Sequence, residues 1–456
     1  MNQTYIPEQW CEISLGDINH YESQSVQPKK FSDETFELWS VPNFPTGKPE
    51  IIHGHDIGSS KQVVEPHDIL ISKINPRINR VWEVGEKLNY RKIASSEWIV
   101  FRQPMIAPRY FLRFFQSSQF RTKLCADVSG VGGSLTRAQP KKVATFPVPL
   151  PPLAEQKVIA DRLDTLLAQV DNTKACLERI PQILKRFRQS VLAAAVSGRL
   201  TDSDSKKWSE FKVEDIVNVI NGKAFPSKDY QDDGVKLIKP GNLHVSGKVV
   251  WNKKNTTFIP TGWLHKRPEL ILRGGVLLMN MTAQSLADEF LGRVCVFREQ
   301  DEPVLLNQRI CAFESKLSYD VKPYLYIFFK SPHFRSYVDT LDSGTLIKHL
   351  NIKDIKSYKM LLPSEEEQTE IVRRVDQLFA YADTVERQVK SALERVNQLT
   401  QSILAKAFRG ELTAQWREEN PELISGENSA EALLERIKAE RAAQAPQKRT
   451  RKKATA

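Results

Sequence analysis

The sequence predicts an α+β protein with two globular domains and two long helices, which pair as an intramolecular antiparallel coiled coil with pseudo-twofold symmetry. Three observations lead to this prediction. The chain has 456 residues, too many for one ordinary core. Residues 189–201 read QSVLAAAVSGRLT, and residues 401–413, 212 positions later, read QSILAKAFRGELT. Each of these stretches ends a long heptad pattern, and strand-like runs precede each pattern.

The repeat extends well beyond the stretch that first reveals it. It runs without a gap from Leu150 against Leu362, and 18 of the 52 aligned positions up to Thr201 are identical. About three identities are expected by chance, so the chain contains an internal duplication. Glu155-Gln156 aligns with Glu367-Gln368.

Apolar residues recur every three and four positions through both copies, which is the seam of a coiled coil. The alternative is a pair of amphipathic helices packed on a globular core, but strict 3.5-residue spacing over this length favours the coiled coil. Pro181 is expected to kink the first helix, because proline lacks an N–H group. The predicted seam consists of Ile159, Leu163, Leu166, Val170, Leu177, Ile180, Leu184, Phe187 and Val191 in the first copy and Ile371, Val375, Leu378, Val385, Val389, Val396, Leu399 and Ile403 in the second.

Glycines mark the ends of both helices. Gly198 and Gly410 stand where a left-handed C-terminal cap belongs, and a Leu-Pro pair precedes each helix. The first helix leaves domain one and enters domain two, and the second helix leaves domain two. If they pair within the chain, they must therefore be antiparallel.

The two globular regions show a mixed pattern of strands and helices. Residues 110–124 and 324–341 are expected to be helical. Strand-like runs occur at residues 68–72, 97–101, 275–279, 293–297 and 309–313.

Composition restricts the class of protein. The formal net charge is +11, which favours a polyanionic partner, nucleic acid first, although a basic tail at residues 448–453 contributes part of it. The five cysteines form no Cys-x-x-Cys pair, so we expect neither a zinc finger nor a disulfide scaffold, and a cytoplasmic location. No apolar run is long enough for a membrane span, so we expect no membrane partner.

No stretch carries a complete catalytic or metal-binding pattern. Gly241 to Lys248 resembles a phosphate loop but has one residue too many between its glycines, so a turn between strands is favoured. His53, His55 and His67 lack the further ligands of a metal site. Asp354-Ile-Lys356 is only a fragment of a nuclease pattern. We therefore predict no catalytic residue and no metal.

Polar and basic residues between the strands are the candidates for DNA contact. Arginine and lysine can recognise guanine, asparagine and glutamine can recognise adenine, and the remaining contacts would bind phosphate. Each residue alone could equally be an ordinary surface residue. The candidates are Lys73, Asn75, Arg77, Asn79 and Arg80 in the first domain and Lys223, Lys228, Lys239, Asn242, Asn280, Thr282, Gln284, Arg293, Asn307, Gln308 and Arg309 in the second.

These motifs resemble those of a known family. Leu150-Pro-Pro-Leu-Ala-Glu-Gln156 before the first helix, Ser197-Gly-Arg-Leu-Thr201 after it and Phe408-Arg-Gly-Glu-Leu-Thr413 after the second resemble the specificity subunit of type I restriction-modification systems, enterobacterial subgroup. The resemblance covers most of the chain and is strongest in the two helical repeats.

The resemblance implies a DNA-recognition subunit without catalysis of its own. Residues 1–148 and 207–361 would be target recognition domains, each for one half of a bipartite site in double-stranded DNA. Residues 149–206 and 362–416 would be spacer helices that set the gap between the halves. Residues 417–456 would hold a short helix, at 429–442, that could touch a partner, and a disordered basic tail.

The resemblance also implies the partners. Two modification subunits with S-adenosylmethionine, which methylate adenine, and restriction subunits with ATP and Mg²⁺ would dock on this chain, which binds no cofactor itself. The outer helix faces and the caps around Gly198 and Gly410 are candidate docking surfaces. Two alternatives stay open: a coiled-coil scaffold that does not read DNA, and a nuclease or methyltransferase acting alone.

Overall fold

The computed structural model describes residues 6–86, 89–126, 128–129, 136–201, 204–284, 289–298, 302–341 and 348–444. Contacts divide the chain into two compact units: unit 1 comprises residues 1–177 and 391–456, and unit 2 comprises residues 178–390. The long helices α5 (Leu153–Ala195) and α11 (Glu365–Phe408) each contribute residues to both units. No helix within the described ranges is long and apolar enough to cross a membrane.

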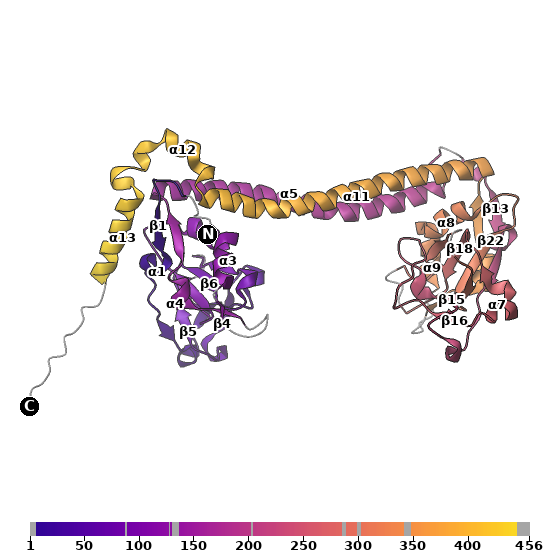
Figure 1. The fold of residues 1–456 in the computed structure, drawn as a ribbon, viewed down its shortest axis with the longest axis horizontal. Coiled ribbons are helices and arrows are strands. Elements are labelled where there is room, and N and C mark those ends of the chain that lie inside the picture. The colour runs from indigo at the N-terminus through magenta and orange to yellow at the C-terminus, as the bar shows by residue number, and fades with distance from the viewer. Residues whose placement is uncertain are drawn as a thin grey trace, which may run out of the picture. The chain divides into compact units, whose positions relative to one another are not determined.

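In each unit the two long helices run side by side in opposite directions (Figure 1). In unit 1, Arg162 near the start of α5 donates a hydrogen bond to the carbonyl of Leu412, just after α11, at 2.6 Å. In unit 2, Arg374 near the start of α11 donates to the carbonyl of Leu200, just after α5, at 2.7 Å. The two donors, Arg162 and Arg374, are 212 residues apart, and so are the two acceptors, Leu200 and Leu412. The two hydrogen bonds are therefore equivalent in the repeat.

The predicted seam positions are buried or half-buried with one exception. Leu399 is 46% exposed. A straight helix drifts by about 20° per heptad relative to an exact 3.5-residue repeat, so the buried face moves around α11 towards its end. There the buried positions are Leu404, Ala407 and Phe408, which pack into the core of unit 1. The helix α5 continues through Pro181.

The described residues of unit 1 form two main sheets and two two-stranded ribbons, β1-β12 and β10-β11. The five-stranded sheet has the order β2-β5-β8-β3-β4, the three-stranded sheet has the order β7-β6-β9, and β1 pairs with β12. The strands are β1 (Cys11–Ser14), β2 (Ser25–Val26), β3 (Thr35–Trp39), β4 (Glu50–His53), β5 (Lys61–Val63), β6 (Ile69–Ser72), β7 (Val81–Glu83), β8 (Arg91–Ala94), β9 (Trp98–Phe101), β10 (Val128–Ser129), β11 (Arg137–Ala138) and β12 (Pro147–Leu150).

An aromatic core joins the helices of unit 1. The sequence predicts one helix over 110–124, but the structure has α2 (Pro108–Gln116) and α3 (Ser118–Ala126), because Ser117 between them has extended backbone angles. Tyr110 and Phe114 of α2 pack edge-to-face on Phe408 of α11, with ring centroids 5.5 and 5.2 Å apart. The remaining short helices are α1 (Leu15–Ile18) and α4 (Pro140–Val143).

The segment after α11 folds back onto unit 1. It contains α12 (Ala414–Glu419) and α13 (Ala430–Gln444). Leu433 and Ile437 of α13 are buried in the core of unit 1, and Arg441 donates a hydrogen bond to the carbonyl of Gly16 at 2.6 Å. The apolar face of this helix therefore packs against its own unit, and contact of its remaining surface with a partner stays a prediction. The predicted basic tail lies outside the described residues.

Unit 2 repeats this plan with different details. Its sheets have the orders β14-β22-β18-β20 and β16-β15-β21-β17, and β13 pairs with β24 as β1 pairs with β12. The strands are β13 (Ser209–Lys212), β14 (Val217–Asn221), β15 (Val235–Ile238), β16 (Phe258–Ile259), β17 (Ile271–Leu272), β18 (Val276–Asn280), β19 (Thr282–Ala283), β20 (Val294–Phe297), β21 (Val304–Leu306), β22 (Ile310–Ser315), β23 (Lys348–His349) and β24 (Lys359–Leu362).

The predicted helix over 324–341 is also interrupted. The Ser331 side chain accepts a hydrogen bond from the backbone of Phe334 and so begins a second helix. The helices of unit 2 outside α5 and α11 are α6 (Val213–Ile216), α7 (Trp263–Lys266), α8 (Lys322–Lys330), α9 (Pro332–Thr340) and α10 (Ile352–Ser357).

A carboxylate joins the start of each long helix to the segment that follows the other, and it is buried in unit 1 and half-buried in unit 2. In unit 1, Glu155 is fully buried and accepts hydrogen bonds from the Trp10 indole at 2.8 Å and the Thr413 hydroxyl at 2.5 Å. In unit 2, Glu367 accepts from the Trp208 indole and the Thr201 hydroxyl, both at 3.0 Å. The threonine that ends each copy of the repeat therefore donates a hydrogen bond to the glutamate at the start of the other copy.

The caps themselves have the predicted conformation. Gly198 and Gly410 adopt left-handed backbone angles, with φ of 78° and 76°. A Cβ on Gly410 would lie 2.3 Å from the Pro7 side chain. Glycine is needed there both for the turn and for the close approach of the chain's first residues.

We predict that Glu155→Ala destabilises unit 1 by about 3 kcal/mol. Arg417 forms an ion pair with Glu155 at 2.5 Å and is itself mostly buried, so removal of the carboxylate leaves a buried charge without its partner. Urea unfolding followed by circular dichroism measures the change. Glu411→Ala, which breaks an exposed ion pair with Arg409, is the control and should change stability by less than about 1 kcal/mol. Equal effects of the two substitutions would contradict the role assigned to Glu155.

Candidate nucleic-acid interface

In unit 1 the chain leaves β6 through a sharply bent loop that carries all five candidate residues. Asn75 and Asn79 both have left-handed backbone angles, with φ of 47° and 51°, and they flank the 3₁₀ helix η4 (Pro76–Ile78). Asparagine tolerates this conformation better than most residues. The bend leaves Arg77 exposed and Ile78 exposed to 53%, while Pro76 is buried.

Backbone hydrogen bonds fix both ends of this loop. The Ser72 N–H donates to the carbonyl of Arg80 at 3.0 Å, and the Lys73 N–H donates to that of Glu97 at 2.9 Å. The Ala138 N–H in turn donates to the carbonyl of Lys73 at 2.9 Å, which places Arg137 beside the loop. We call Lys73, Arg77, Arg80 and Arg137 the loop edge of unit 1.

Lys73 and Arg80 are half-buried at this edge. The Lys73 ammonium donates to the carbonyl of Ser96, and burial lowers the pKa of Lys73 from its ordinary value. The Arg80 guanidinium reaches the carbonyl of Ile74 at 3.5 Å. The charged ends of both side chains are thus held against backbone carbonyls of their own unit.

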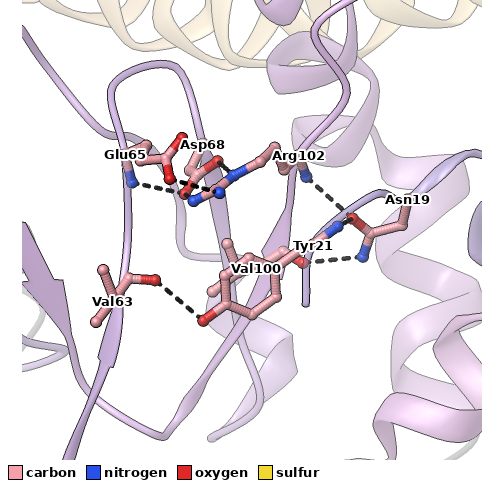
Figure 2. A network of polar contacts seen from close by, with 7 residues as sticks. All are labelled: Asn19, Tyr21, Val63, Glu65, Asp68, Val100 and Arg102. Carbon is pink, nitrogen blue, oxygen red and sulfur yellow. Dashed lines mark hydrogen bonds and ion pairs between the residues drawn. The ribbon is translucent and has the colours of Figure 1, made fainter. Parts of the chain in front are cut away.

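An ion pair holds the opposite ends of the strands β6 and β9. Figure 2 shows Arg102, which follows β9, donating two hydrogen bonds to Asp68, which precedes β6, both at 2.7 Å. These bonds to Asp68 raise the pKa of Arg102. Asn19 accepts from the Arg102 N–H at 3.0 Å and donates to the carbonyl of Val100 at 3.0 Å. The loop edge therefore projects from a fixed base.

The same network also ties the five-stranded sheet to this base. The Tyr21 hydroxyl donates to the carbonyl of Val63, at the end of β5, at 3.2 Å (Figure 2). The Arg102 guanidinium lies over the Tyr21 ring, 5.4 Å from its centroid. The two sheets of unit 1 are thereby linked through one arginine and one tyrosine.

Unit 2 repeats the backbone frame of this edge. The Asn280 N–H donates to the carbonyl of Arg293 at 2.9 Å, and the Met281 N–H donates to that of Arg309 at 2.9 Å. The Leu350 N–H donates to the carbonyl of Met281 at 2.9 Å, as Ala138 does to Lys73 in unit 1. Arg293 therefore occupies the backbone position of Arg80, and Met281 occupies that of Lys73.

In unit 2 the ends of β15 and β21 add further residues to this edge. The strands β15 and β21 are parallel, so both end on the same side of their sheet. The Asn307 N–H donates to the carbonyl of Ile238 at 3.2 Å, next to Lys239, and the Gln308 N–H donates to that of Lys223 at 2.9 Å. We call Lys223, Lys239, Arg293, Gln308 and Arg309 the loop edge of unit 2.

Two cationic side chains of this edge, Lys239 and Arg293, lie over aromatic rings. The Lys239 ammonium lies 5.3 Å from the centroid of the Tyr230 ring, and burial lowers the pKa of Lys239. The Arg293 guanidinium lies 4.8 Å from the Phe290 centroid. These contacts support long cationic side chains at the edge.

Three predicted asparagines brace the backbone instead of projecting from the edge. Asn280 is fully buried and donates to the carbonyls of Thr282 and Phe290, both at 2.8 Å. Asn242 is fully buried and accepts from the Lys239 N–H at 2.8 Å. Asn307 accepts from the Arg309 N–H at 3.1 Å. Their amide groups shape the loops, so we leave them out of the loop edge.

The remaining candidates lie at the margins of unit 2. Thr282, on β19, pairs with His349 on β23. Gln284 and Lys228 are exposed, Lys228 on the 3₁₀ helix η6 (Ser227–Asp229). The structure ties none of these three to the loop edge by a hydrogen bond between described residues.

Sequence reasoning missed Ile78, Arg137 and His349. Arg137 and His349 occupy equivalent positions, since Arg137 bridges to Ile74 as His349 pairs with Thr282. Arg137 follows Ser129-Gly130 and His349 follows Ser343-Gly344, and these two Ser-Gly pairs align between the halves of the sequence. This alignment could have predicted that Arg137 and His349 occupy equivalent positions. Ile78 stands alone between polar residues, and no pattern in the sequence predicted its exposure.

The stretch that partly resembles a phosphate loop forms a turn. Residues 241–248 form a tight turn in which Leu243 bridges to Val249 and Gly247 has a φ of 78°, as predicted. Among the described residues, no group of three or more His, Cys, Asp or Glu could hold a metal ion. All five cysteines are free, and burial raises the pKa of Cys295 to about 12.

Comparison with known proteins identifies the family. Residues 7–182 and 205–395 match the family model of the type I restriction modification DNA specificity domain. The chain is 35% identical to the StySPI specificity subunit of Salmonella potsdam over 480 aligned positions, which cover 100% of both chains. The chain belongs to the type I restriction-modification specificity subunits.

Other relatives agree with this assignment. The specificity subunit is 43% identical to the EcoKI specificity subunit of Escherichia coli K12, over 77% of this chain and 75% of the relative. It is 48% identical to the EcoBI specificity subunit of Escherichia coli, over 67% of each chain. The enterobacterial subgroup expected from the helical repeats is thereby confirmed.

Two solved structures share the fold. A specificity subunit (HsdS) from Thermoanaerobacter tengcongensis has a TM-score of 0.64 and 20% identity, covering 89% of this chain and 98% of its own. A chain from a study of complex assembly and conformational transition of the type I system has a TM-score of 0.68 and 19% identity, covering 89% and 99%. The predicted fold class, with two α+β regions and antiparallel long helices, is confirmed.

We predict that Gly222→Ala destabilises unit 2 of this specificity subunit by about 1 to 3 kcal/mol. A Cβ at Gly222 would lie 2.0 Å from the carbonyl oxygen of Asn307, so the end of β14 must move away from the loop edge. Chemical denaturation measures the loss. Gly262→Ala is the matched control, because a Cβ there meets nothing within 4 Å. An equal, small effect at both glycines would contradict the tight packing of this edge.

Proposed function

We propose that this specificity subunit reads an asymmetric bipartite site in double-stranded DNA, with one target recognition domain for each half. The observation that carries the proposal is the shared backbone frame of the two loop edges. Equivalent hydrogen bonds fix both edges, but lysine at position 73 corresponds to methionine at 281, and glutamate at 97 corresponds to arginine at 309. Two domains that share backbone hydrogen bonds but carry different side chains at the loop edge are expected to bind different DNA sequences.

The chemistry of the edges supports direct contact with base edges and phosphates. Arg77, Gln308 and Arg309 are exposed at bends of the chain. Arginine can form two hydrogen bonds with guanine in the major groove, and glutamine can do so with adenine. The net charge of +11 favours binding to a polyanion.

In this proposal the two long helices set the nonspecific gap between the half-sites. Residues 1–148 and 207–361 act as the recognition domains, and residues 149–206 and 362–416 act as spacers. A spacer of fixed length gives a fixed gap, on the order of one helical turn of DNA between half-site centres.

The specificity subunit acts through its partners in the cytoplasm. Two modification subunits methylate adenine with S-adenosylmethionine, and restriction subunits use ATP and Mg²⁺ to cleave DNA. This chain contributes no catalytic group and no cofactor. It delivers the partner active sites to the DNA sequence that its loop edges recognise.

The decisive experiment selects DNA from a random library. The chain, purified with its modification subunit, is incubated with random duplexes, and retained duplexes are sequenced. The proposal expects two short, different blocks separated by one fixed gap. Enrichment of no sequence at any salt concentration would favour a coiled-coil scaffold, and labelling or cleavage of DNA by the isolated chain would favour an independent enzyme.

We predict that Arg77→Ala and Arg309→Ala change different blocks of the selected site. Each substitution removes an exposed guanidinium from one loop edge, so it should relax one block and leave the other unchanged. A contact of this kind contributes about 1 to 3 kcal/mol of discrimination. Selection with each variant measures the change, and each variant is the control for the other. Loss of both blocks in either variant would contradict the proposal that each domain recognises one half of the site.

We predict that a heptad inserted into both long helices lengthens the gap by about three base pairs. Seven residues add about 10 Å to a helix, and base pairs are 3.4 Å apart along the DNA axis. The insertions follow Leu177, the last residue of α5 in unit 1, and Lys390, the last residue of α11 in unit 2. Selection of DNA by the variant measures the gap. An unchanged gap would show that the helices do not set it.

A further inference from the structure

In unit 1, two arginines of the helix α2 bind carboxylates of α5. Asp164 of α5 accepts hydrogen bonds from Arg109 at 2.8 Å and from Arg113 at 2.8 and 3.0 Å, both on α2. Arg109 also binds Asp161 at 2.8 Å. The bonds to Asp164 raise the pKa of Arg109. One carboxylate thus receives two guanidinium groups.

Unit 2 keeps the carboxylate and lacks both arginines. Asp376 of α11 stands 212 residues after Asp164. The helix α8 corresponds to α2 residue by residue, since Tyr110, Phe114 and Phe115 align with Tyr324, Phe328 and Phe329. Arg109 and Arg113 then align with Pro323 and Ile327.

No hydrogen bond or ion pair reaches the Asp376 carboxylate from any residue that the structure describes. Asp376 is exposed on one side, and the partial burial of its carboxylate raises its pKa from the ordinary value of an aspartate. In unit 1 the equivalent Asp164 is fully engaged by two arginines. The difference leaves a carboxylate whose partners are missing from its own unit.

A cavity occupies the place beside this carboxylate. It has a volume of about 270 Å³ and lies between α11, α8 and the adjacent sheet. Leu192, Pro323, Ile327, Val372 and Phe379 contribute an apolar lining, and Asp376 and Asp320 contribute carboxylates. Lys322 is the one cation among its lining residues, and it forms an ion pair with Asp320 at 3.6 Å.

We propose that this cavity receives an arginine side chain of the modification subunit, which forms an ion pair with Asp376. The inference rests on the proposed function, because that function supplies the partner. The guanidinium replaces the ones that Arg109 and Arg113 supply in unit 1. The apolar lining covers the aliphatic part of the side chain, and the carboxylates neutralise its charge.

Arginine fits this cavity better than lysine for two reasons. Its planar fork can bind one carboxylate through two parallel hydrogen bonds, whereas an ammonium is a point charge. Guanidinium is also less strongly hydrated, so its transfer into a partly apolar cavity is easier. In unit 1, Asp164 accepts two hydrogen bonds from Arg113 on one oxygen and one from Arg109 on the other, so this position of the repeat accommodates guanidinium groups.

Binding of the modification subunit to the full-length chain tests the proposal. Asp376→Asn removes the charge and should raise the dissociation constant by about tenfold or more, because it leaves the incoming arginine without its carboxylate. Pro323→Arg introduces an arginine where Arg109 stands in unit 1. That side chain should pair with Asp376 from within, fill the cavity and weaken binding by a similar factor.

Two matched controls separate docking from folding. Pro323→Ala removes the proline without supplying a cation and should keep the parental affinity. Asp164→Asn makes the same chemical change at the equivalent position of unit 1, where the arginines are internal. It should lower the melting temperature of the chain but leave the affinity for the modification subunit unchanged.

A photo-crosslinking residue in place of Phe379 identifies the partner segment. The proposal expects a crosslink to a modification-subunit peptide that contains an arginine. Exchanging that arginine for aspartate should weaken binding, and Asp376→Arg in this chain should restore it. Such rescue requires a direct pair and does not follow from a change in folding.

The outcomes are distinct. Parental affinity in both Asp376→Asn and Pro323→Arg, or a crosslink confined to this chain, overturns the arginine pocket while the proposed function stands. Absence of any binding by the parental chain, together with no selected DNA sequence, overturns the proposed function and the pocket with it. Weakened binding in the two variants and rescue by the charge exchange support the pocket.

Discussion

The hydrogen bonds of the buried Glu155 and the half-buried Glu367 carboxylates are the interactions on which the rest of the structure depends. Each begins one long helix and binds a threonine that ends the other, so helix pairing, helix length and the entry of the chain into a globular region are fixed together. Each also binds the indole that precedes the first strand of its unit. A buried carboxylate tolerates this position only when its oxygens are fully bonded. That requirement keeps the glutamate, the threonine and the tryptophan together in both copies of the repeat.

The parts of the fold that the sequence predicts are those set by short-range patterns along the chain. Heptad spacing, terminal glycines and the Leu-Pro pairs act over short distances along the chain, so their meaning can be read without knowledge of the tertiary structure. The antiparallel helices and most strand cores therefore match the expectation. Leu399 departs from it because the buried face drifts around α11, and the breaks at Ser117 and Ser331 depend on backbone angles that helical periodicity does not reveal.

The candidate interface is only partly predictable, because polar residues in loops have two competing uses. Asn242, Asn280 and Asn307 have the side chains expected of base readers, yet each amide group satisfies backbone groups of its own loop. Arg77, Gln308 and Arg309 have the same kind of sequence context and are exposed. Which use prevails depends on strand register, such as the pairing that brings Arg137 beside Ile74. Register is a property of strands that are distant in sequence.

The two halves of the repeat share backbone hydrogen bonds at the loop edges but differ in their side-chain bonds. A bond between an N–H and a carbonyl is indifferent to the side chain, so the frame that links Ser72 to Arg80 survives as the frame that links Asn280 to Arg293. Side-chain pairs need both partners, and the pair of Asp164 with Arg113 becomes Asp376 with Ile327 when one partner changes. A duplicated protein built in this way can vary what its loop edges and helix faces contact while it keeps the positions from which they do so.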